Sequence, residues 1–179
     1  MDRSQTLAEI RSFLQADGAI PARHLLEWMD SDDLEVLGAV ITLLRDSPHR
    51  IQGALKQDRM VQRVLHYHRR CLLENPQEEC AHNRYQAGVS LRYFFFQFSA
   101  DEEISGRALA AIKTMLAELY RPGDSELRAC IVTSCLEHLF ESRRIAAYFS
   151  DWQEDPILAA AYTEALEWGR DFWPGQHGY

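Results

Sequence analysis

Histidine and cysteine side chains in two neighbouring stretches could together bind a metal ion. His66, His68 and Cys71 lie close together in the chain, and Cys80 and His82 follow shortly after them. Zinc prefers nitrogen and sulfur ligands that converge tetrahedrally. On a helix, positions three apart share a face and positions two apart do not, so His68 and Cys71 would pair with the two later residues. The set His68, Cys71, Cys80 and His82 matches no standard zinc finger, and we expect two surface histidines, a buried thiol and loop residues there, with no metal and no other cofactor.

A second kind of chemistry would need a cysteine nucleophile beside a base. Cys130 and Cys135 lie on the apolar side of a predicted helix, and His138 lies three positions after Cys135. Such a pair could act together, but a thiol on an apolar helix face is typical of packing. The chain also lacks a glycine-rich phosphate loop, H-E-x-x-H and G-x-S-x-G. We therefore predict a protein that is not an enzyme.

Acidic residues form three clusters, each at a predicted corner between helices. The clusters are Asp30, Asp32, Asp33 and Glu35; Asp101, Glu102 and Glu103; and Asp151, Glu154 and Asp155, with Trp152 inside the third. Capping of helix N-termini and solubility explain such carboxylates in part. An exposed tryptophan beside carboxylates would instead favour binding of a cationic protein. We expect Trp152 to be exposed, and we predict that these clusters bind a partner, with capping as the alternative.

The overall charge argues against two classes of partner. The formal net charge is −8 and the pI is about 5.3. Binding to nucleic acid or to an anionic membrane requires a basic surface. The pairs Arg69-Arg70 and Arg143-Arg144 are too small and too far apart to form one. We expect neither nucleic acid nor membrane as a partner.

The location of the protein is predicted from what the sequence lacks. It has no apolar run of the length that spans a bilayer, and its first residues do not resemble a signal peptide. The four cysteines are then expected to be reduced thiols, as is usual in a cytoplasm. We predict a cytoplasmic protein of undetermined oligomeric state.

Composition and periodicity predict an all-α fold. Leu (21) and Ala (20) far outnumber Val (6), Ile (9) and Thr (5), and proline falls at predicted helix ends. We predict a single domain over residues 1–179, with a mobile tail at 174–179. Its roughly eight helices would stack as antiparallel hairpins, in a bundle or a short HEAT-like solenoid. The predicted helices span 5–16, 22–29, 33–46, 49–73 with a break near 57–58, 77–98, 101–120, 124–141 and 156–172, with a short helical turn at 144–149.

The predicted helix 77–98 is unusually aromatic. Six aromatic rings lie between Asn83 and Phe98, four of them consecutive from Tyr93 to Phe96. A helix that is apolar nearly all round is enclosed by other helices. We therefore expect this helix to be the central one, enclosed on all sides, with Ala87 and Gly88 allowing a neighbouring helix to approach closely.

Two short phrases of the sequence resemble a known group of proteins. Asn83-Arg84-Tyr85-x-Ala87-Gly88, followed by an aromatic helix, resembles the R-Y-x-A-G segment of small acidic all-α proteins of bacteria. Tyr162-x-x-Ala165-x-x-Trp168-Gly169 is similar to the end of the same group. Many of these proteins are similar to immunity proteins, which neutralise a secreted toxin in the cytosol of the cell that produces it. The resemblance covers about a fifth of the chain and transfers no catalytic residue.

These observations together predict a protein-binding function. We expect an immunity protein that occludes the active site of a cationic bacterial toxin domain, with the acidic clusters attracting the toxin. The first alternative is a helical-repeat scaffold or adaptor that binds a peptide or protein in a concave groove. The second is a metal-binding protein that uses His68, Cys71, Cys80 and His82.

Overall fold

The computed structural model confirms the all-α fold. It describes residues 2–53, 55, 57–100 and 105–173. Within these ranges, regular structure is helical apart from two strands of two residues each. The predicted tail at 174–179 and the acidic residues Asp101, Glu102 and Glu103 lie outside the described residues.

The chain divides into two compact units, Met1–Asn83 and Arg84–Tyr179. Each has its own set of helices and its own buried side chains. The two units are described separately below, and the single domain over residues 1–179 stays a prediction.

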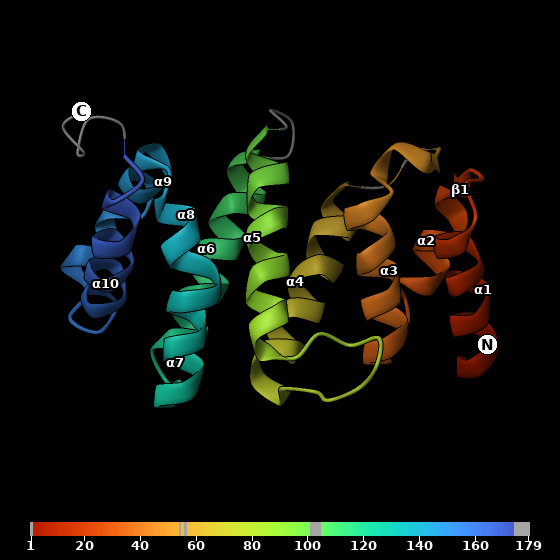
Figure 1. The fold of residues 1–179 in the computed structure, drawn as a ribbon, viewed down its shortest axis with the longest axis horizontal. Helices are drawn as coiled ribbons and strands as arrows, with labels where there is room; N and C mark the ends of the chain where they lie inside the picture. The colour runs from red at the N-terminus through yellow and green to blue at the C-terminus, as the bar shows by residue number, and fades with distance from the viewer. Residues whose placement is uncertain (1, 54, 56, 101–104, 174–179) are drawn as a thin grey trace. The chain divides into compact units, whose positions relative to one another are not determined.

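The first unit is built on one central helix. Its elements are α1 (Arg3–Gln15), β1 (Ile20–Pro21), α2 (Ala22–Trp28), α3 (Leu34–Asp46), a 3-10 turn (Pro48–Arg50), β2 (Ile51–Gln52) and α4 (Gln57–Glu74). The strands β1 and β2 pair in parallel. Most residues of α3 are buried, and α3 contacts α1, α2 and α4 (Figure 1). Its apolar stripe, predicted from the sequence, thus forms the core of this unit.

The helix predicted at 49–73 begins later, at the predicted break. Pro48 starts only a short 3-10 turn, and α4 begins at Gln57. The intervening residues Ile51 and Gln52 form β2 with β1 instead of continuing a helix. Helix α4 thus starts where the break was predicted, and the α-helix predicted before that point is wrong.

The start of the predicted helix 77–98 is also wrong. The helix α4 ends at Glu74, and Asn75 takes a left-handed conformation with φ of 47°, which asparagine tolerates better than most residues. Pro76 therefore follows a helix end and does not begin a helix. The segment beyond it passes so close to α3 that a Cβ added to Gly38 would lie 1.9 Å from the carbonyl oxygen of Cys80. Helix α5 begins at Arg84.

The second unit contains the aromatic helix. Its helices are α5 (Arg84–Ala100), α6 (Ser105–Tyr120), α7 (Ser125–Ile131), α8 (Glu137–Phe140), α9 (Arg143–Tyr148) and α10 (Leu158–Arg170). A π-helical segment, Val132–Leu136, joins α7 to α8, and a 3-10 segment, Ser150–Glu154, precedes α10. Figure 1 shows α7 and α8 as one continuous column, and this column contacts both α5 and α10.

Two glycines allow the helices of this unit to pack closely. A Cβ added to Gly88 on α5 would lie 1.8 Å from the hydroxyl oxygen of Ser134. On α10, a Cβ added to Gly169 would lie 2.4 Å from the carbonyl oxygen of Phe140. Both distances are far below a normal contact. The predicted close approach of a neighbouring helix at Gly88 is thus confirmed.

The expectation that this aromatic helix is enclosed on all sides is wrong. Its buried face carries Leu91, Phe94, Phe95 and Phe98. The opposite face leaves aromatic rings in solvent, with exposed fractions of 55% for Tyr85, 38% for Tyr93 and 40% for Phe96. The helix is therefore not enclosed on all sides, because these three rings of its second face are exposed.

A candidate protein-interaction surface

The predicted binding cluster at 151–155 does not expose its tryptophan. Trp152 is only 3% exposed, because the 3-10 segment turns it inward, where its ring lies 5.1 Å from that of Phe149. The expectation of an exposed Trp152 is wrong, and this residue contributes to the core of the second unit.

The carboxylates of the same cluster are engaged within the chain. Asp151 forms an ion pair with Lys113. Asp155 accepts hydrogen bonds from the backbone N–H groups of Ile157 (2.9 Å) and Leu158 (3.0 Å), and Arg121 donates to it at 3.0 Å. The backbone hydrogen bonds, together with Arg121, lower the pKa of Asp155. Asp155 thus caps the start of α10, as the capping alternative predicts, while Glu154 is exposed.

The first acidic cluster is likewise paired within its own unit. Asp33 caps α3 by accepting hydrogen bonds at 3.0 Å from the N–H groups of Glu35 and Val36. Asp30 pairs with Arg59, which lowers the pKa of Asp30. The Asp32 carboxylate is exposed and lies 3.7 Å from the guanidinium group of Arg63. The predicted partner-binding role of these carboxylates stays untested.

The four residues considered for a metal lie in a buried aromatic cluster or at its edge. The rings of His68 and His82 lie 5.2 and 5.6 Å from that of Tyr67. Burial lowers the pKa of His68 to about 3 and that of His82 to about 4, and it raises the pKa of Cys71 to about 11. Among the described residues, no three His, Cys, Asp or Glu side chains converge as metal ligands. The expectation of surface histidines is wrong for His68, which is fully buried, because its ring packs against that of Tyr67.

The structure does not place Cys135 and His138 as a nucleophile and its base. Cys135 is buried, and burial raises the pKa of its thiol to about 12. The Nδ1 atom of His138 instead lies 2.7 Å from a carboxylate oxygen of Glu141. The thiol is held protonated, which opposes nucleophilic chemistry.

A different set of side chains forms an exposed aromatic surface on the second unit. We use the name aromatic surface for Tyr93 and Phe96 of α5, His138 of α8, and Trp168 and Phe172 at the end of α10. The exposed fractions of Trp168 and Phe172 are 43% and 53%. Large rings left in solvent at neighbouring positions are unusual on a protein that binds nothing.

An open groove forms one half of this surface. Arg92, Tyr93, Phe96 and Gln97 line it from α5, and His138 and Glu141 line it from the other side. Its volume is about 430 Å³. The contact of 2.7 Å between the Nδ1 atom of His138 and the carboxylate of Glu141 holds the imidazole ring beside the groove. A partner side chain entering the groove would thus meet two aromatic rings and several polar groups.

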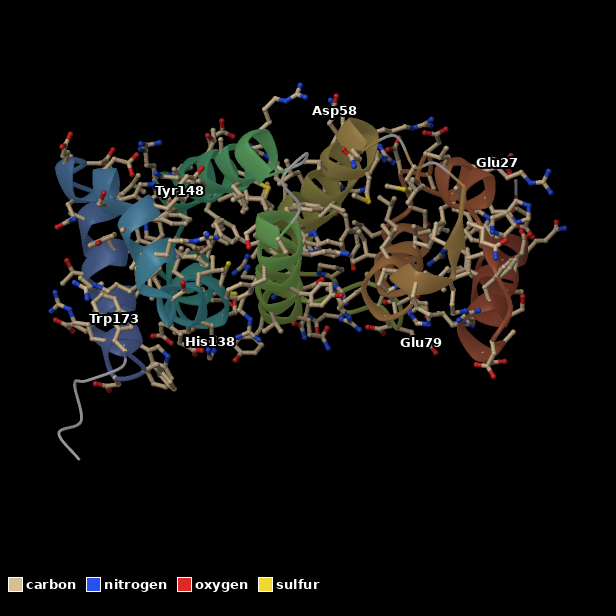
Figure 2. The ribbon with its side chains drawn as sticks, turned by 90° about the horizontal axis from the view of Figure 1, so that it is seen from above. Glu27, Asp58, Glu79, His138, Tyr148 and Trp173 are labelled. Carbon is tan, nitrogen blue, oxygen red and sulfur yellow. The ribbon has the colours of Figure 1, made fainter. Side chains whose placement is uncertain are left out.

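The histidine connects this groove to the end of α10. The ring of His138 lies edge-on to that of Trp168, with centroids 6.1 Å apart, and Phe172 lies 5.8 Å from Trp168. The chain after α10 is fixed by Trp173, which donates a hydrogen bond of 2.9 Å to the carbonyl oxygen of Phe140. Figure 2 shows His138 and Trp173 on the side of this unit opposite to Tyr148.

Two carboxylates accompany the aromatic surface on the same pair of helices. Glu164 lies one turn before Trp168 on α10, and Glu137 is the neighbour of His138 on α8. Burial raises the pKa of Glu137, and the negative charge of Glu164 raises it further. In the part of the chain that the structure describes, neither carboxylate has a Lys or Arg partner.

The sequence shows the residues of this surface but does not show that they are exposed. Trp168 belongs to the second motif of the resemblance, and Tyr93 and Phe96 belong to the aromatic helix, which the sequence assigns to the core. Positions 93 and 96 share a face of α5 because they lie three apart. Nothing in the spacing says that this face remains uncovered.

Comparisons with protein-family models, with curated proteins and with solved structures found no match for this chain. No helix among the described residues is both long enough and apolar enough to cross a membrane.

Proposed function

We propose that this chain is a non-catalytic protein-binding module, and that it acts as an immunity protein that neutralises a bacterial toxin in the cytoplasm. The observation that supports this most is the aromatic surface, in which Tyr93, Phe96, Trp168 and Phe172 remain exposed around His138. Exposed aromatic side chains are the residues that contribute most to binding in protein interfaces.

The mechanism would be steric occlusion. Aromatic rings with few rotatable bonds provide a large contact area at a low entropic cost. The net charge of −8 would accelerate association with a cationic toxin domain. The paired carboxylates of the corner clusters then contribute to the long-range field, and the aromatic surface makes the contacts.

The test uses a toxin domain encoded next to this chain. Co-expression of the two should restore growth, and the purified proteins should form a complex at micromolar concentration in which the toxin is inactive. Absence of association at that concentration would refute the proposal.

Variants then test the surface. Phe96→Ala should weaken binding by about 2 kcal/mol, or roughly 30-fold, as is typical of an interface aromatic residue. The matched control is Tyr85→Ala, which removes another exposed ring from α5 at about 16 Å along the helix and should change affinity little. Equal losses in the two variants would show that the groove is not the contact.

A helical adaptor would give a different result. It would bind a protein through the same surface but leave the activity of the toxin domain unchanged in the complex. Measurement of toxin activity at saturating concentrations of this chain therefore separates inhibition from simple binding.

A further inference from the structure

The end of α10 combines an exposed indole ring with carboxylates that have no cationic partner among the described residues. Trp168 is 43% exposed, and Glu164 lies four positions before it, which places both on one face of the helix. Helix α8 packs against α10, and Glu137 on α8 lies close enough to Glu164 for the charge of Glu164 to raise its pKa. Elsewhere, carboxylates such as Asp30, Asp151 and Asp155 have an arginine or lysine beside them.

A pair of like charges costs free energy unless a cation joins them. This cost appears in the pKa of Glu137, which burial and the charge of Glu164 both raise. Two charged groups act on the pKa of Glu137: Glu164 on α10 raises it, and His138 on α8 lowers it. His138 is already engaged with Glu141 at 2.7 Å. A positive charge supplied from outside would remove the repulsion between the two glutamates.

The indole ring selects the kind of cation. Cations bind to the face of tryptophan more strongly than to other aromatic rings. A guanidinium group is planar, stacks on an aromatic ring and donates to two carboxylates at once, whereas an ammonium group is a strongly hydrated point charge. Arginine therefore fits the combination of one indole ring and two carboxylates better than lysine does.

We infer that Trp168, Glu164 and Glu137 form a binding site for an arginine side chain of the partner protein. This inference rests on the proposed function. The guanidinium group stacks on Trp168 and donates hydrogen bonds to the two carboxylates. An apolar side chain next to that arginine then enters the groove between Tyr93 and Phe96. The partner is thus a protein segment with an arginine beside an apolar residue.

The site can be tested without the toxin, by titrating the whole chain with the peptide acetyl-Gly-Arg-Gly-amide. Indole N–H signals in two-dimensional NMR report on the tryptophans, and Trp168→Phe assigns the relevant signal. We expect the Trp168 signal to move and to saturate in the millimolar range. The same peptide with citrulline, which has the shape of arginine without its charge, should bind at least fivefold more weakly. An equal response to both peptides, or no movement, would overturn the inference.

Matched variants test whether the carboxylates of Glu137 and Glu164 bind the arginine side chain. The double variant Glu137→Gln with Glu164→Gln should weaken arginine binding at least threefold, and Glu154→Gln, at an exposed glutamate of the 3-10 segment, should leave it unchanged. Thermal unfolding of each variant verifies that it is folded. Equal affinities in the double variant and the control would refute the assignment of the carboxylates.

A second copy of the chain is the competing occupant. If sedimentation shows a dimer that Trp168→Ala dissociates, this surface is a self-interface and the inference is wrong. Failure of the peptide titration while the toxin domain is still neutralised refutes only the arginine site. Arginine binding without neutralisation of any toxin domain refutes only the proposed function.

Discussion

Because two histidines of the first unit are buried, we predict that the free energy of unfolding of this unit decreases in mild acid. His68 and His82 have pKa values of about 3 and about 4, lowered first by burial, from an ordinary value of 6.5. The charge of Arg45 lowers both further, and among the described residues the buried Nδ1 atom of His82 has no hydrogen-bond partner. The folded unit therefore binds fewer protons than the unfolded chain, and protonation favours unfolding.

The size of the effect follows from the pKa difference. The stability that a histidine of lowered pKa contributes is fully present above pH 6.5 and is lost as the pH falls towards the folded pKa. At pH 5 the unfolded chain is 1.5 units below that value while the folded histidines are still neutral. At 1.36 kcal/mol per unit, each histidine costs about 2 kcal/mol at pH 5, and the two together about 4 kcal/mol.

The assay is urea unfolding at pH 7.5 and pH 5.0. Fluorescence from Trp28 reports on the first unit when Trp152, Trp168 and Trp173 of the second unit are replaced by phenylalanine. His82→Gln should reduce the difference between the two pH values by about 2 kcal/mol, and His49→Gln, at an exposed position, should not. An unchanged pH dependence in His82→Gln would refute the reasoning.

Three further substitutions test the packing and capping described above. Gly88→Ala should lower stability by about 1–3 kcal/mol despite the better helix propensity of alanine, because its Cβ would overlap Ser134; a raised melting temperature would contradict this packing. Trp152→Ala should lower the free energy of unfolding in urea by about 3–5 kcal/mol because the ring of Trp152 is in the core. A loss below about 1 kcal/mol would mean that this ring lies at the surface. Asp33→Ala should cost about 1 kcal/mol because it removes the cap of α3, and calorimetry showing no change would mean that water replaces the cap.

Local patterns in the sequence were sufficient to predict the helices but not all of their ends. The stripe of α3 and the break before Gln57 follow from spacing and composition, which act over a few residues. The loop after Asn75 does not, because the segment holding Cys80 is fixed by its close contact with Gly38 on α3, more than thirty positions away. An asparagine followed by proline begins a helix or ends one depending on such a contact. Tertiary packing thus decided the start of α5.

The candidate site was predicted less well than the fold. In a helical protein, carboxylates can cap helices or bind a partner, and aromatic rings can fill the core or bind a partner. Carboxylates at corners cap helices, as Asp33 and Asp155 do, so their clustering in the sequence is weak evidence for a partner. Glu164 lies in the middle of a helix, where the macrodipole does not explain it, and it lies one turn from the exposed Trp168. Among the described residues, Glu164 neither caps a helix nor pairs with a Lys or Arg, and the ring one turn away is 43% exposed. This combination, rather than acidity alone, is therefore the stronger argument for a cationic partner.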